Sequence, residues 1–64
     1  MRIDQKILIH CTDTDKDAEG TILRIYKGSI DVKISDMIIK MHQQKSNLYV
    51  GSMHGLEFTA LLKL

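Results

Sequence analysis

Apolar residues recur at every second position along much of this chain, in short runs separated by polar residues. The run SIDVKIS, residues 29–35, shows this most clearly, because Ile30, Val32 and Ile34 alternate with polar residues. A period of two places alternate side chains on opposite faces of a β-strand. The pattern therefore predicts strands with one buried and one exposed face, and it favours a mainly β fold.

Further segments have the same character and are separated by polar or glycine-containing turns. They are residues 6–12, 21–26, 47–51 and 56–64. Proline is absent from the chain, so glycine and polar clusters mark the turns. Lys27-Gly28 lies between two apolar runs, which is the signal of a tight hairpin.

Residues 36–46 have two interpretations. Met37, Ile39 and Met41 form one face of a strand, followed by a polar turn. Met37, Ile38 and Met41 instead form the apolar stripe of a helix. The period alone does not separate the two for so short a run. The strand is the favoured interpretation and the helix is the alternative.

Five to six short strands around one small core predict an all-β fold, either a small antiparallel barrel or a strongly curved sheet. Residues 1–64 are expected to form this single domain. A chain of 64 residues has a marginal core, and such folds are usually reinforced by disulfides, a metal or self-association. Cys11 is the single cysteine, so no internal disulfide forms, and self-association is expected.

The stretch TDTDKDAEG, residues 12–20, carries a carboxylate at every second position, as a calcium loop does at its start. An EF-hand loop beginning at Asp13 would need glycine at its sixth position and glutamate at its twelfth. This chain has Ala18 and Arg24 there. Residues 13–19 are therefore expected to be a solvated connection between the first two strands, and no metal site is predicted.

No acid, base and nucleophile converge at a readable spacing. His10 and Cys11 are adjacent, and adjacent residues of a strand face opposite sides. Cys11 is therefore expected in the core, as a free cysteine usually is. The chain is not expected to be an enzyme, and no cofactor is predicted.

No apolar run reaches the length of a membrane span, and the N-terminus lacks a signal-peptide pattern. A free cysteine without an export signal is typical of a reducing compartment. The chain is therefore predicted to be cytoplasmic, without a membrane partner.

The net charge of +1 is low for a nucleic-acid binder, which usually shows a strong basic excess. Few basic and aromatic groups are expected on outward faces for binding bases, namely Lys6, Lys33, Lys40, Arg24 and Tyr26. A small OB-like or Sm-like nucleic-acid-binding barrel is kept as an alternative function. An α+β oligomeric protein with a helix at 36–46 is the other alternative.

Three short segments share a pattern with one known family. Residues 2–6 read RIDQK, residues 24–29 read RIYKGS and residues 55–58 read GLEF. In order and spacing they are similar to the R-x-x-x-R, [D/N]-x-S-x-x-G and G-x-x-F motifs of PilZ domains. These are small bacterial β-barrels that bind cyclic di-GMP, so the resemblance implies a non-catalytic binding or regulatory module.

The resemblance implies Arg2, Lys6, Arg24 and Tyr26 as ligand-binding residues, but several motif positions differ. The second arginine of the family is Lys6 here, its Asp/Asn is Arg24, its serine is Tyr26 and its last glycine is Ser29. A lysine supplies a point charge and lacks the planar fork with which arginine pairs with phosphate. The chain therefore resembles a degenerate PilZ domain, and protein partners are expected in place of cyclic di-GMP.

Leu8 and Leu61 are predicted on the outward faces of the first and last strands, each between polar neighbours. Contiguous apolar groups on a protein surface usually mark an interface. We expect Leu8 and Leu61 to form the interface of a homo-oligomer. The identity of any other protein partner is not readable from the sequence.

Overall fold

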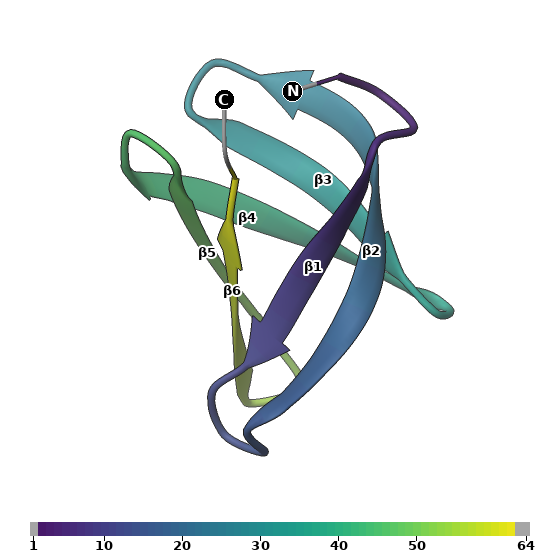
Figure 1. Ribbon diagram of the computed structural model, residues 1–64, viewed down its shortest axis with the longest axis vertical. Coiled ribbons are helices and arrows are strands. Elements are labelled where there is room, and N and C mark those ends of the chain that lie inside the picture. The colour runs from purple at the N-terminus through teal and green to yellow at the C-terminus, as the bar shows by residue number, and fades with distance from the viewer. Residues whose placement is uncertain (1, 63–64) are drawn as a thin grey trace.

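A computed structural model describes residues 2–62 of the chain. Six antiparallel strands follow one another around a closed barrel, and the first strand meets the last to close it (Figure 1). The strands are β1 (Lys6–Cys11), β2 (Lys16–Tyr26), β3 (Ser29–Ile34), β4 (Met37–Lys45), β5 (Leu48–Met53) and β6 (Leu56–Leu61). The predicted all-β antiparallel barrel is confirmed.

Alternate residues of the strands fill the inside of the barrel. In β3, Ile30, Val32 and Ile34 are buried, as the alternation predicts. The full core consists of Ile7, Ile9, Cys11, Ile22, Ile30, Val32, Ile34, Ile39, Met41, Tyr49, Phe58, Ala60 and Leu62. Most of these are β-branched or aromatic side chains, which suit a pleated and half-buried surface. Leu64, which the sequence places on the same inner face, lies outside the described residues.

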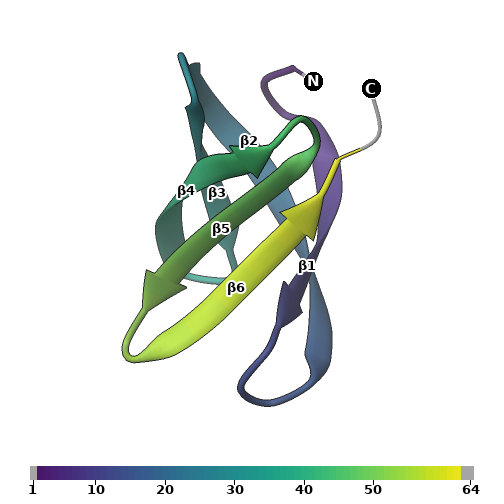
Figure 2. The same ribbon diagram turned by 90° about the vertical axis from the view of Figure 1, so that its left-hand side faces the viewer.

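Short turns join consecutive strands, and Figure 2 shows one such hairpin, β5 and β6, side by side. The predicted hairpin at Lys27-Gly28 is confirmed between β2 and β3. Gly28 has a φ of 83°, a left-handed conformation that glycine adopts without steric cost. This turn fixes the register in which Tyr26 is paired with Ser29.

The helical alternative for residues 36–46 is wrong, because these residues form β4. Ile39 is paired with Val32 of β3 and Met41 with Ile30, and both Ile39 and Met41 are buried. Ile38, which the helical stripe would have buried, is 54% exposed. Pairing with β3 on one side and β5 on the other satisfies the backbone as a strand and sets its period at two.

The acidic stretch is only partly a connection, which corrects the prediction for residues 13–19. β2 already begins at Lys16, so Asp17 and Glu19 are strand residues paired with β1. Gly20 allows this long strand to cross the core closely. A Cβ atom there would lie 2.6 Å from Cγ1 of Val32 and 2.9 Å from Cγ1 of Ile9.

The seam between β1 and β6 is where the barrel closes. Within residues 2–62, the paired register of these strands consists of His10–Thr59 and Cys11–Phe58. By contrast, β1 and β2 are in register over all of β1, from Lys6–Thr21 to Cys11–Lys16. The seam is therefore the shortest ladder of the barrel, and the first half of β1 lies beyond its paired part.

Candidate functional site

Two of the residues that the PilZ resemblance implies lie at the start of the chain, beside β2. The backbone N–H of Arg2 donates to Oε1 of Gln5 at 3.0 Å. The Lys6 ammonium donates to Oγ1 of Thr21 at 2.9 Å. Arg2 and Lys6 are both exposed, and the segment is held against β2 by the N–H of Ile22, which donates to the carbonyl of Gln5 at 3.0 Å.

The other two implied residues lie further along β2, where it pairs with β3. Arg24 is paired with Asp31. The Tyr26 hydroxyl donates to Oδ2 of Asp31 at 2.9 Å, and the Lys40 ammonium lies 4.5 Å from the centroid of the Tyr26 ring. The ring face and the hydroxyl of Tyr26 therefore already have partners within the barrel.

These four residues do not line a common cavity, since no pocket is present in the part of the chain that the structure describes. Arg2 and Lys6 border the middle of β2, whereas Arg24 and Tyr26 face β3. A small ligand normally binds in a concave site that buries most of its surface. The structure therefore places the four residues in two separate pairs along β2.

The two predicted interface residues lie on the two strands that form the seam. Leu8 is 63% exposed and Leu61 is 64% exposed. Counting two residues on from His10–Thr59 in each strand brings Leu8 level with Leu61 across the seam. The outward direction predicted for both side chains is confirmed, whereas their use as an interface stays a prediction.

The apolar area extends to a third strand. Leu48 of β5 is paired with Leu61 and is partly exposed. We call Leu8, Leu48 and Leu61 the leucine surface. It lies across the outer side of β1, β6 and β5, and Val50 of β5 adds a half-buried apolar side chain beside it.

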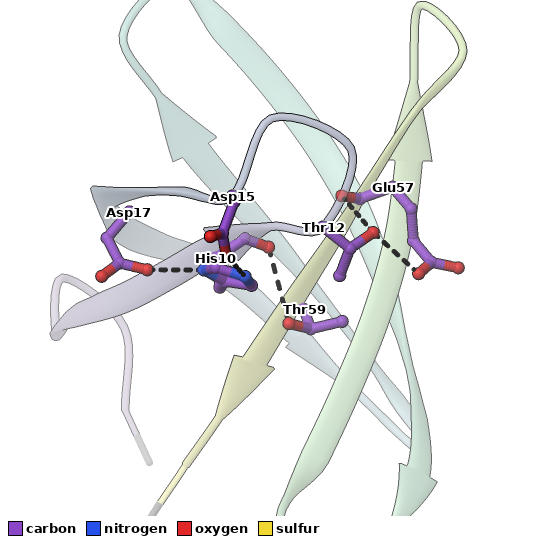
Figure 3. A network of polar contacts seen from close by, with 6 residues as sticks. All are labelled: His10, Thr12, Asp15, Asp17, Glu57 and Thr59. Atoms are coloured by element: carbon purple, nitrogen blue, oxygen red, sulfur yellow. Dashed lines mark hydrogen bonds and ion pairs between the residues drawn. The ribbon is translucent and has the colours of Figure 1, made fainter.

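The other end of the seam is closed by polar contacts (Figure 3). The N–H of Thr12 donates to the carbonyl of Glu57 at 3.0 Å, and the Thr12 hydroxyl donates to Oε1 of Glu57 at 3.0 Å. The N–H of Glu57 in turn donates to Oδ2 of Asp13 at 2.6 Å. These bonds fasten the loop between β1 and β2 to the start of β6.

His10 lies between two carboxylates at this end (Figure 3). Its Nδ1 is 2.7 Å from Oδ1 of Asp17, and its Nε2 is 3.3 Å from Oδ1 of Asp15. A neutral imidazole donates from one nitrogen, whereas the protonated ring donates from both. The three residues form a surface cluster that is acidic in either protonation state of the histidine.

Cys11 is a buried free thiol, as the sequence predicts. A hydrogen bond from the side chain of Thr14 lowers the pKa of the thiol below its ordinary value, although desolvation by burial opposes this. Hydrogen bonds from the backbone of Thr14 and Asp13 also lower the pKa. Donors to the thiolate favour the charged form.

Two negative findings apply to residues 2–62. No group of three or more His, Cys, Asp or Glu side chains is placed to hold a metal ion, and no helix there is long and apolar enough to cross a membrane. Of the carboxylates in the acidic stretch, Asp13 accepts from the N–H of Glu57, whereas Asp15 and Asp17 both lie beside His10.

Sequence reasoning missed Leu48 and the acidic cluster around His10. The apolar run at 47–51 indicates a strand that contains Leu48. That Leu48 lies beside Leu61 is shown only by the pairing of β5 with β6. The cluster is not apparent from the sequence, because the acidic stretch predicts a solvated connection over residues 13–19. β1 and β2 form a hairpin in which β2 begins at Lys16, and its register pairs Asp17 with His10.

Comparison with protein-family models, curated proteins and solved structures gave no match to this chain.

Proposed function

We propose that this chain is a non-catalytic binding module, resembling a degenerate PilZ domain, that acts through protein contacts and self-association. The observation that carries the proposal is the leucine surface. Leu8 and Leu61 are each more than 60% exposed on neighbouring strands, and Leu48 adjoins them. Contiguous exposed leucines on a small soluble barrel favour a protein interface.

The arrangement of the motif residues supports protein contacts over cyclic di-GMP. Tyr26 and Arg24 face Asp31, an acidic neighbour that is unfavourable for a phosphate. Lys6 stands where the family has an arginine, and it contacts Thr21. The proposal includes no cofactor and no catalytic step. The buried free thiol of Cys11 supports a reducing, cytoplasmic location.

Sedimentation equilibrium tests the proposal on the wild type and on Leu61→Glu. We expect the wild type to be a dimer or larger at tens of micromolar, and Leu61→Glu to shift toward monomer. A charge buried in an apolar contact costs far more free energy than a charge in water.

Ile38→Glu is the matched control, because Ile38 is 54% exposed on the outer face of β4, away from the leucine surface. It should sediment as the wild type does. All variants should keep a β-type circular dichroism spectrum. A wild type that remains monomeric, or equal dissociation by both variants, would refute the proposal.

A further inference from the structure

The outer face of β1 carries three kinds of group in order along one strand. Lys6, Leu8 and His10 alternate with buried residues, so their side chains share the outer face. Lys6 is basic and Leu8 is apolar, while His10 holds the carboxylates of Asp15 and Asp17. The face is therefore basic at one end, apolar in the middle and acidic at the other end.

The acidic end remains accessible to a partner. Although Oδ1 of Asp17 lies 2.7 Å from Nδ1 of His10, the side chain of Asp17 is 57% exposed. The side chain of Asp15 keeps 94%. Two carboxylates outweigh one histidine, so this end stays negative whether the imidazole is neutral or protonated.

The basic end is equally accessible. Lys6 is exposed, and its ammonium donates to the hydroxyl of Thr21. That partner is neutral, and Lys6 forms no ion pair with another residue of the range 2–62. A long flexible lysine side chain can turn toward an opposing carboxylate while its apolar stem packs on the surface.

We infer that a second copy of this chain docks on the leucine surface with its β1 antiparallel to the first. The two-fold axis lies between the copies and runs across the strands, along the row of Leu8 and Leu61. Each leucine then packs on the same leucine of the other copy. Lys6 of each copy faces the Asp15–His10–Asp17 cluster of the other.

This arrangement is self-complementary, as an isologous contact requires. With the axis turned to run along the strands, Lys6 would face Lys6 and the acidic clusters would face each other. Like charges across an interface are costly, whereas opposite charges fix the register of the partners. The order of charge along β1 therefore selects the antiparallel arrangement.

The inference rests on the self-association proposed above, and charge reversal tests it separately. Lys6→Glu and Asp17→Lys each place like charges opposite each other at both symmetric contacts. We expect each variant to weaken dimerisation about tenfold or more, measured by sedimentation equilibrium. The effect should shrink as salt is raised, because salt screens exposed charges.

Two variants with the same charge changes elsewhere serve as controls. Lys33→Glu changes an exposed residue of β3, away from the contact. Asp36→Lys changes an exposed residue in the turn between β3 and β4, away from the contact. Both should dimerise as the wild type does.

Mixing the two test variants gives the decisive measurement. In a mixed dimer, Glu introduced at position 6 faces Lys introduced at position 17, and the native Lys6 faces the native acidic side. An equimolar mixture of Lys6→Glu and Asp17→Lys should therefore dimerise about as well as the wild type, although neither variant does so alone.

The outcomes distinguish the two proposals. A monomeric wild type overturns both. If Leu61→Glu dissociates the dimer while Lys6→Glu and Asp17→Lys leave it intact, the self-association stands and the antiparallel arrangement is wrong. If both charge variants dissociate and their mixture stays monomeric, the arrangement is also wrong, because the loss then arises within each copy.

Discussion

The two ends of the seam between β1 and β6 are completed in different ways. At the loop end, Thr12 and Asp13 exchange hydrogen bonds with Glu57, and His10 is in register with Thr59. At the other end, Leu8 and Leu61 lie beyond the paired register with most of their side-chain surface exposed. One end is closed by polar groups within the chain, and the other carries apolar groups without such closure.

This difference indicates which part of the seam gains free energy when a partner covers it. Hydrogen bonds within the chain satisfy the polar groups of the loop end, so a partner gains little by replacing them. Exposed leucines gain free energy when any apolar surface covers them. The leucine end is therefore the part of the seam from which we expect most of the free energy of association, and the contacts of Thr12 and Asp13 with Glu57 stabilise the monomer.

The largest expected effect separates the inside of β1 from its outside. Ile9→Ala should lower the free energy of unfolding by about 2–5 kcal/mol, because Ile9 is fully buried and its truncation leaves a cavity. Leu8→Ala should change it by less than about 0.5 kcal/mol in dilute monomer, as exposed positions usually do. Urea unfolding measures both. Similar losses of unfolding free energy in the two variants would place Leu8 in the core and would remove Leu8 from the exposed end of the seam.

A smaller effect is expected at the loop end. Asp13→Ala removes the acceptor of the Glu57 N–H, and we expect a loss of about 1 kcal/mol in the free energy of unfolding. Its sedimentation should not change. Glu19→Ala, which removes an exposed carboxylate from the adjacent strand, is the control and should stay within about 0.5 kcal/mol. Dissociation by Asp13→Ala would extend the interface to the contact between Asp13 and Glu57.

The smallest effect concerns the thiol beneath the loop. Thr14→Val removes the side-chain donor to Cys11, so the pKa of the thiol should rise toward its ordinary value. Ultraviolet absorbance of the thiolate during a pH titration measures this. Thr21→Val, which alters a contact of Lys6, should leave the titration unchanged. An unaltered titration in Thr14→Val would mean that the backbone donors alone set the pKa.

The sign of the linked stability follows from the lowered pKa. The folded state favours the thiolate, so its contribution is fully present above the pKa of the unfolded chain and is lost as the pH falls through the folded pKa. Wild type should therefore gain stability relative to Thr14→Val as the pH rises through this window. The thiolate contributes nothing well below it.

Much of the fold was predictable because the side-chain period of a strand is local. The alternation of Ile30, Val32 and Ile34 gave the buried face of β3, and the Lys27-Gly28 turn gave a hairpin. The start of β2 was not predictable from its own residues. Lys16 to Glu19 are residue types that are depleted in strands, and they are strand because they pair with β1. Tertiary pairing overrides a weak local preference.

The candidate site divides in the same way. The sequence alone determined that Leu8 and Leu61 face outward, because each occupies the polar side of an alternating run. Tertiary structure decided that their strands, β1 and β6, are neighbours, that Leu48 is paired with Leu61 and that Asp15 and Asp17 lie beside His10. The physical reason is that the side of the sheet on which a side chain lies depends on the period of its own strand. Which side chains are adjacent depends on the register between strands, and closure of the barrel pairs strands from opposite ends of the chain.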